Sequence, residues 1–169
     1  NGVAAGAGAN IALACDITFA KESASFIQAF SKIGLIPDSG GTFFLPRIIG
    51  MQKATALMMT GDKVTATQAE SLNLIYKAVS DESFEKEVYD FVQNLAKMPT
   101  KGLGLTKRAL NASFTNDLTS QLELEEELQN LETEHNEYVV NADQELMLNR
   151  QQIENLGKFL LEQKENFSN

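Results

Sequence analysis

The chain has 169 residues, of which 43% are hydrophobic and 22% are charged, a balance typical of a globular domain. Its formal net charge of −9 argues against a nucleic-acid partner and against an anionic membrane surface, because both would repel it. No apolar run approaches the roughly 20 residues of a membrane span, and the first residues lack the basic segment of a secretory signal. The single cysteine, Cys15, lies in an apolar run that predicts its burial. One thiol cannot form a disulfide within the chain, which favours a protein of the reducing cytoplasm.

The first half of the chain alternates short strand patterns with helical ones. Residues 1–8 are rich in Gly and Ala, which predicts a tight loop that leads into a buried helix. The motif Thr65-Ala66-Thr67-Gln68 fits a capping box and predicts a helix start. The expected elements after the first helix are strands over 16–20 and 24–27 joined by a turn, helices over 42–49, 51–60 and 65–72, and a strand over 74–79.

The second half is helical throughout. Helices are expected over 83–97 and 100–112, separated by Pro99, and from Thr115 onward, ending in a long polar helix over 137–164. One face of the first of these helices carries Phe84, Val88, Phe91, Val92 and Leu95, and Leu118, Leu122, Leu128 and Leu131 are expected on one face of the last.

The fold class is therefore α/β giving way to an all-α region. We expect a core over residues 1–114 and a helical oligomerisation region over 115–169. The strands are too few to close a sheet core alone, so the chain is expected to be a fragment or to complete its core with a partner.

Asp38 is the acid that looks placed for chemistry. Pro37 fixes the backbone before it, and Gly40 and Gly41 follow, so the side chain is held on a rigid loop. The alternative is a turn or N-cap aspartate of the helix that begins near Thr42, which the local residues alone favour.

Other candidate residues are weaker. His135 lies in a polar helix, where a surface role is more common than catalysis, and Ser39 has no histidine near it in sequence. Four glutamates of the last helix lack the oxygen-rich loop of a calcium site and predict a solvated helix face. They are Glu123, Glu125, Glu126 and Glu127. No metal motif is present.

Three collinear segments resemble the crotonase (enoyl-CoA hydratase/isomerase) superfamily. They are residues 1–17, residues 34–50 with the run Ile36-Pro37-Asp38-Ser39-Gly40-Gly41, and residues 60–69. The resemblance covers roughly residues 1–130, and within the family the Asp38 loop is most similar to that of isomerases acting on ring-epoxidised phenylacetyl-CoA.

The resemblance implies the C-terminal part of a spiral of ββα units, followed by a helical region that forms a homotrimer or a dimer of trimers. It implies an acyl-CoA thioester as substrate, with coenzyme A part of that substrate and no permanently bound cofactor. It also implies an oxyanion hole of two backbone N–H groups, the second of which is similar in position to that of Ala7. Fixed N–H donors stabilise the enolate that forms when a proton leaves the carbon beside a thioester.

Two positions depart from the hydratases of the family. Where hydratases carry a pair of glutamates, this chain has Asn10 and Phe30, neither of which exchanges a proton. Asp38, similar in position to the catalytic aspartate of several isomerases, is the remaining carboxylate and favours isomerisation. Two alternatives stay open: a hydratase with Asp38 as its sole acid–base group, and an assembly module without catalysis whose helices begin near Asp117.

The resemblance also implies elements that this sequence does not match. The first oxyanion donor and the CoA-binding loop of the family lie in an N-terminal half, so the chain is expected to be a C-terminal fragment. Lys164 is similar to a lysine near the CoA phosphates of a neighbouring subunit, and the open alternative is a solvated lysine on the helix surface. The segment 134–157 is longer than the family usually allows. An acyl pocket for an aromatic ring, or ordinary core packing, would account for Phe26, Phe30, Phe43 and Phe44.

Overall fold

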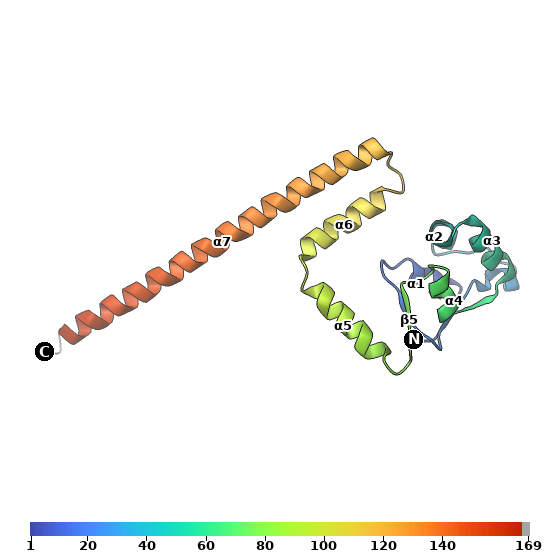
Figure 1. Ribbon diagram of the computed structural model, residues 1–169, viewed down its shortest axis with the longest axis horizontal. Helices are drawn as coiled ribbons and strands as arrows, with labels where there is room; N and C mark the ends of the chain where they lie inside the picture. The colour runs from blue at the N-terminus through green and yellow to red at the C-terminus, as the bar shows by residue number, and fades with distance from the viewer. Residues whose placement is uncertain (167–169) are drawn as a thin grey trace. The chain divides into compact units, whose positions relative to one another are not determined.

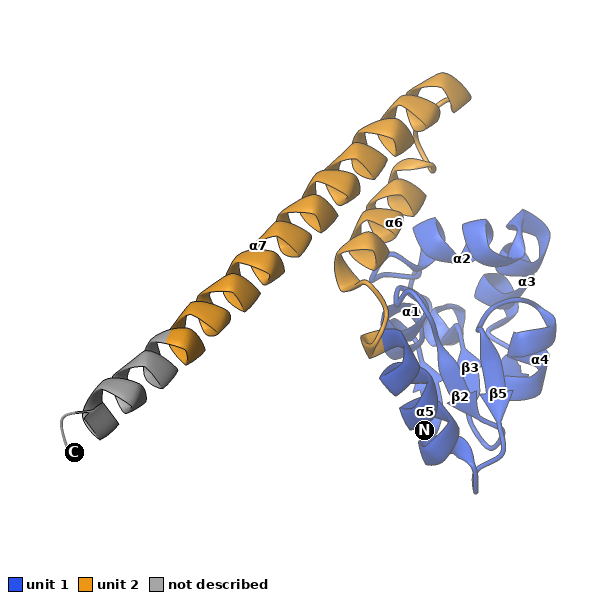
Figure 2. Ribbon diagram, turned by 60° about the vertical axis from the view of Figure 1, so that its left-hand side comes forward, with its two compact units in different colours: residues 1–95 blue, residues 96–169 orange. Residues whose placement is uncertain are grey.

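The computed structural model describes the backbone of residues 1–166 and the side chains of residues 1–155. The chain divides into two compact units, Asn1–Leu95 and Ala96–Asn169, which Figure 2 colours separately. The expected boundary between residues 114 and 115 separates the α/β core from the helical oligomerisation region, and it stays a prediction. No helix in the described part of the chain combines the length and apolar character needed to cross a membrane.

The first unit is built on two small sheets. One has the order β1-β3-β4, in which β1 (Val3–Ala5) pairs parallel with β3 (Ser25–Ile27) and β3 pairs antiparallel with β4 (Lys63–Thr65). The other pairs β2 (Phe19–Lys21) parallel with β5 (Lys77–Val79). The parallel pairs join segments far apart in the sequence, as a fold of repeated crossovers requires.

The two strands expected over 16–20 and 24–27, with the turn between them, are confirmed in shorter form, since β2 spans Phe19–Lys21 and β3 spans Ser25–Ile27. The two strands do not pair with each other, because they belong to different sheets. Two strands, β1 and β4, were not predicted, because three residues are too few to show an alternating pattern. Tertiary pairing therefore decides these strands.

The helices agree closely with their predicted ranges, and Figure 1 labels most of them. The described helices of this unit are α1 (Ala7–Leu13), α2 (Gly41–Ile49), α3 (Met51–Thr60), α4 (Ala66–Ser71) and α5 (Phe84–Ala96), with a 3₁₀ helix over Ala29–Ile33. Gly61 ends α3 in the left-handed region with φ 63°, which favours glycine. Phe91 of α5 packs edge to face on Phe19 of β2 at 5.0 Å, whereas Val92 is 50% exposed.

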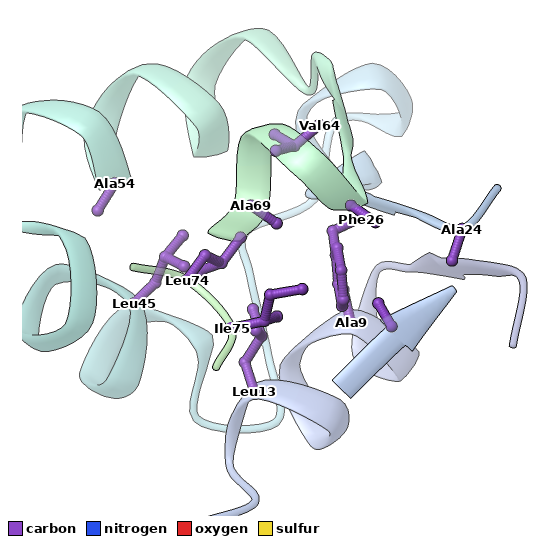
Figure 3. Close-up of a cluster of buried hydrophobic side chains, with 12 residues drawn as sticks. Ala9, Leu13, Ala24, Phe26, Leu45, Ala54, Val64, Ala69, Leu74 and Ile75 are labelled. Carbon is purple, nitrogen blue, oxygen red and sulfur yellow. The ribbon is translucent and has the colours of Figure 1, made fainter. Parts of the chain in front are cut away.

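The core of the first unit joins helices to strands through small residues. Ala9, Ala66 and Ala69 are fully buried and let their helices approach the sheet closely. Figure 3 shows Leu45 and Leu74 lying side by side within this cluster of buried side chains. Alanines give little pattern in a sequence, yet these three set the distance between the helices and the sheet.

Cys15 corrects the expectation of burial, because its side chain is exposed. The apolar run that contains it does not form one buried element: α1 ends at Leu13, and Cys15 follows the helix cap at Ala14. Its Sγ donates to the Ile11 carbonyl at 3.6 Å.

The predicted capping box is confirmed at the start of α4. The Gln68 backbone N–H donates to Thr65 Oγ1 at 3.3 Å, and the Thr65 N–H donates to Gln68 Oε1 at 3.0 Å. We expect Thr65→Ala to lower the free energy of unfolding by about 1 kcal/mol, because the Gln68 N–H loses its acceptor, the Thr65 hydroxyl oxygen. Chemical denaturation measures this, with Thr67→Ala inside the same helix as the matched control; an equal loss in both variants would contradict the cap.

The second unit consists of α6 (Thr100–Ala112) and α7 (Leu118–Asn166), and Figure 2 shows α6 alongside the first part of α7. Leu128 of α7 is buried with 4% exposure. Side-chain bonds tie the helices: Gln121 Nε2 donates to the Ala109 carbonyl at 3.1 Å, and Lys101 Nζ donates to the Leu131 carbonyl at 3.0 Å. The Arg108 guanidinium also pairs with the Glu127 carboxylate at 3.4 Å.

The expected single leucine face of α7 is wrong. Leu118 and Leu122 are 75% and 56% exposed, whereas Leu128 is buried. The six-residue step from Leu122 to Leu128 turns the helix by about 600°, which leaves these leucines about 120° apart around the helix axis, so they point in different directions. The face that α6 covers carries Gln121, Leu128 and Glu132.

Candidate functional site

Gly6 anchors the loop between β1 and α1. It adopts φ 55° as the N-cap of α1, and its N–H donates to the Ile27 carbonyl of β3 at 2.9 Å. Its own carbonyl accepts from the N–H groups of Ala9 and Asn10 at 3.1 and 3.2 Å. A positive φ is readily adopted by glycine, so the residue type fixes the path of the loop.

Ala7 is the first residue of α1 and is half-buried. The N–H groups of the first helical turn, including those of Ala7 and Gly8, have no intrahelical carbonyl to bond, because the first such bonds are made by Ala9 and Asn10. Ala7 therefore offers a backbone donor in the way that the sequence predicts, while its role in an oxyanion hole stays a prediction.

Asp38 lies on the exposed loop between the 3₁₀ helix and α2. Its backbone carbonyl accepts from the Gly41 N–H at 2.9 Å and from Asn10 Nδ2 at 2.8 Å. Its carboxylate Oδ1 accepts from the Ser39 hydroxyl at 3.0 Å. The N-cap of α2 is Gly40, so Asp38 is not that cap. The other half of the alternative, a turn aspartate, agrees with the bond from the Gly41 N–H to the Asp38 carbonyl, which closes a turn over residues 38–41.

A buried amide pair supports this loop. Asn10 is 2% exposed and Gln28 4% exposed, and Gln28 Nε2 donates to Asn10 Oδ1 at 2.8 Å. The Asn10 side chain thus accepts from Gln28, which directly follows β3, through its oxygen and donates to the Asp38 carbonyl through its nitrogen. One side chain of α1, three residues after Ala7, therefore fixes the position of the Asp38 loop.

Gly41 shows how closely the two segments approach. A Cβ at Gly41 would lie 2.7 Å from Asn10 Cγ, which no real contact allows. The glycine that follows Asp38 in the motif is therefore required for α2 to start against α1.

The sequence alone shows Asn10 only as a residue that cannot exchange a proton, and its structural role was not predicted. A polar amide inside the apolar stretch of Ala9–Leu13 was the available signal, because a buried amide needs partners. Its partners, Gln28 and the Asp38 carbonyl, are distant in sequence and could not be named beforehand.

The four candidate aromatic residues do not form one group. Phe26 belongs to the buried core, whereas the Phe30 ring lies 3.6 Å from the position a Cβ would take at Gly6. Phe43 and Phe44 of α2 pack edge to face at 5.2 Å, and the Arg47 guanidinium lies 3.7 Å above the Phe43 ring. Core packing accounts for Phe26, and only the last three lie near the loops of Gly6 and Asp38.

The remaining candidates lie elsewhere. His135 is half-buried on α7, and Ser39 serves as a hydrogen-bond donor to Asp38. Lys164 lies outside the residues whose side chains are described. Among the described side chains, no group of three or more His, Cys, Asp or Glu residues could hold a metal ion. A groove of about 710 Å³ lies between α6 and α7 and is lined in part by Leu103, Thr106, Ala109 and Leu128. Neither Ala7 nor Asp38 lines it, and of the weaker candidates it includes Glu125.

A family model described as enoyl-CoA hydratase/isomerase matches residues 1–145. The 1,2-epoxyphenylacetyl-CoA isomerase of Escherichia coli is 48% identical over 131 residues, which cover 78% of this chain and 50% of that protein. A probable enoyl-CoA hydratase of Rhodobacter capsulatus is 45% identical over 129 residues, covering 76% and 50%. The chain spans about half the length of these curated relatives.

Solved structures give the same result. A putative enoyl-CoA hydratase/isomerase from Mycobacterium abscessus superimposes with a TM-score of 0.73 at 35% identity, covering 77% of this chain and 50% of that one. A putative enoyl-CoA hydratase from Thermobifida fusca, solved in complex with acetoacetyl-CoA, gives 0.77 at 30% identity, covering 80% and 53%.

Proposed function

The chain belongs to the enoyl-CoA hydratase/isomerase family, and from this premise we propose that it takes part in the isomerisation of an acyl-CoA thioester through an enolate. The α/β crotonase-like fold predicted from the sequence is confirmed. Two relatives bear isomerase names: the E. coli protein, and a trans-2-decenoyl-[acyl-carrier-protein] isomerase of Streptococcus mutans at 46% identity over 86 residues.

The observation that carries the proposal is how Asp38 is held. The loop is fixed through the backbone carbonyl of Asp38, so its carboxylate stays exposed with only the Ser39 hydroxyl as its recorded donor among the described residues. Asn10 is committed to two hydrogen bonds, and Phe30 has no ionisable group. Asp38 is thus the acid–base group of this site.

The proposed reaction needs one carboxylate and one polarised carbonyl. The Ala7 N–H, with a second donor that the family resemblance assigns to the other half of the active site, binds the thioester oxygen. Asp38 takes a proton from one carbon of the acyl chain as the electron pair moves toward that oxygen, and returns the proton to another carbon. The double bond moves, and no cofactor is consumed.

The finer features implied by the resemblance belong to this proposal. Coenzyme A arrives as part of the substrate, and Lys164 binds its phosphates. The complete enzyme assembles as a homotrimer or a dimer of trimers and works in the cytoplasm.

Hydration is the second candidate, since several relatives carry hydratase names, including the R. capsulatus protein. A hydratase must both activate water and protonate the adjacent carbon, and here Asp38 would perform both steps alone. The third candidate, a non-catalytic assembly module, rests on the long helix α7.

A side-by-side assay separates the three candidates. We propose to test the chain alone and a fusion of the chain to the half of the E. coli isomerase that it does not match, each with the same enoyl-CoA. The expected result is double-bond migration by the fusion without accumulation of a 3-hydroxyacyl-CoA. Accumulation of the hydroxy product identifies a hydratase. Absence of both reactions, together with absence of CoA-thioester binding by calorimetry, supports the assembly module and contradicts isomerisation.

A further inference from the structure

The second part of α7 extends beyond the helix that covers its first part. At 1.5 Å per residue α6 is about 20 Å long and α7 about 74 Å, so within this unit α6 covers only a fraction of α7 (Figure 2). Val139, Leu146 and Ile153 lie further along α7 and are 42%, 52% and 71% exposed. Most of the stability of a helix in a protein comes from the packing of its apolar face, so this segment is expected to have a packing partner.

These apolar side chains continue the face that α6 covers. Val139 follows the buried Leu128 by eleven residues and Leu146 follows it by eighteen, which are about three and five full helical turns. The same face is therefore buried at Leu128 and open at Val139 and Leu146.

The open face has a strict seven-residue repeat. Val139, Leu146 and Ile153 are spaced by seven, and Ala142 and Asn149 stand three residues after the first two. We call these five residues the seam. A seven-residue repeat with alternating steps of three and four is the signature of a coiled coil. Val139, Leu146 and Ile153 then take position a, and Ala142 and Asn149 take position d.

We propose that the seam binds the seam of a second copy of this chain in a parallel, in-register, two-stranded coiled coil. Val139 and Ile153 are the β-branched residues that two-stranded coiled coils prefer at position a, although the d positions here hold Ala142 and Asn149 and not Leu. In register, Asn149 faces the Asn149 of the partner and the two amides bond each other, whereas in an antiparallel pair Asn149 would face Leu146 and its amide would lack a partner. The single polar position thus selects both the orientation and the register.

The charges beside the seam agree with this arrangement. Glu145 occupies position g and Arg150 the following position e, and in a parallel pair the two lie opposite each other across the copies. Both side chains are exposed. Two such pairs of opposite sign form across the dimer, against the general repulsion of two chains that each carry a net charge of −9.

The seam differs from the assembly that the family resemblance implies. The family model ends at residue 145, so Leu146, Asn149 and Ile153 lie beyond the sequence matched to it. This contact is therefore a property of this chain in addition to any trimer formed by the shared fold.

A matched pair of leucines tests the seam. Leu146 and Leu148 are 52% and 61% exposed, but Leu148 lies at an outer position of the repeat. We expect Leu146→Glu to halve the mass of the assembly in sedimentation velocity and Leu148→Glu to leave it unchanged. Equal masses for both variants would overturn the proposal. Because Leu146→Glu could weaken α7 itself, Asn149→Leu provides a second test: it should tighten the association, and a weaker association would overturn the proposal.

Cysteine cross-linking tests the orientation in a background with Cys15→Ser. In the parallel arrangement Val139 faces Val139 of the partner at a separation that a disulfide spans, so Val139→Cys should give a covalent dimer upon mild oxidation. The neighbouring outer position, Val140→Cys, is the control and should remain largely monomeric on a denaturing gel. Equal cross-linking of both variants, or none at Val139, would contradict a parallel seam.

Discussion

Asp38→Asn is expected to lower the rate of isomerisation by the fusion about 10²- to 10⁴-fold, the contribution typical of a general acid–base group. The substitution preserves the size and shape of the side chain, and Asn10 bonds the backbone carbonyl of Asp38, which the substitution does not change. The loop should therefore keep its position, and the apparent KM should change little while kcat falls. Steady-state kinetics with an enoyl-CoA substrate measures both constants.

Asp62→Asn is the matched control, because Asp62 is also an exposed aspartate in the same unit. It should leave kcat unchanged. An Asp38→Asn variant with full activity would refute the assignment of Asp38 as the proton carrier. A rise in KM with unchanged kcat would assign Asp38 to substrate binding instead.

Asn10→Leu is expected to lower the free energy of unfolding by about 1–3 kcal/mol, because it leaves the buried Gln28 amide without its acceptor. It also removes one of the two donors to the Asp38 carbonyl, and the Gly41 N–H remains. The loop then loses its link to α1, so kcat should fall more than KM rises. Denaturation and steady-state kinetics on the same variant measure the two effects.

A double-mutant cycle with Gln28→Leu separates the network from simple packing. If the bond between Asn10 and Gln28 matters, the double variant should lose less stability than the sum of the single variants, because no amide is then left half-paired. Strict additivity would show that the two side chains act independently. Unchanged kcat in Asn10→Leu would contradict the positioning role of Asn10.

Local patterns predicted the helices well and the strands poorly. Gly61 and the Thr65 capping box mark helix ends through contacts within a few residues, so the sequence alone reveals them. β1 and β4 exist because they pair with β3, whose residues are about 20 to 40 positions away, and three-residue strands carry too little pattern of their own. Leu128 illustrates the same limit, since α6 decides which face of α7 is buried.

At the candidate site the sequence identified Ala7 and Asp38 but not the side chain that links their segments. The motif around Asp38 predicted a rigid loop, and the structure explains part of that rigidity by the bond from Asn10. Residue 41 is a glycine for a related reason, because a Cβ there would collide with the same Asn10 side chain. Both facts depend on the approach of α1 to α2, which local sequence does not encode.

The most direct test of the central claim follows the proton during the incubation of the fusion with an enoyl-CoA in D₂O. Because the Asp38 carboxyl is exposed, a share of the protons that it takes from the substrate is replaced by solvent deuterium before transfer to the second carbon. The account therefore predicts deuterium on carbon in the isomerised product, detected by NMR, and its loss in Asp38→Asn. A 3-hydroxyacyl-CoA as the main product, or equal deuterium incorporation by the Asp38→Asn variant, would contradict the account.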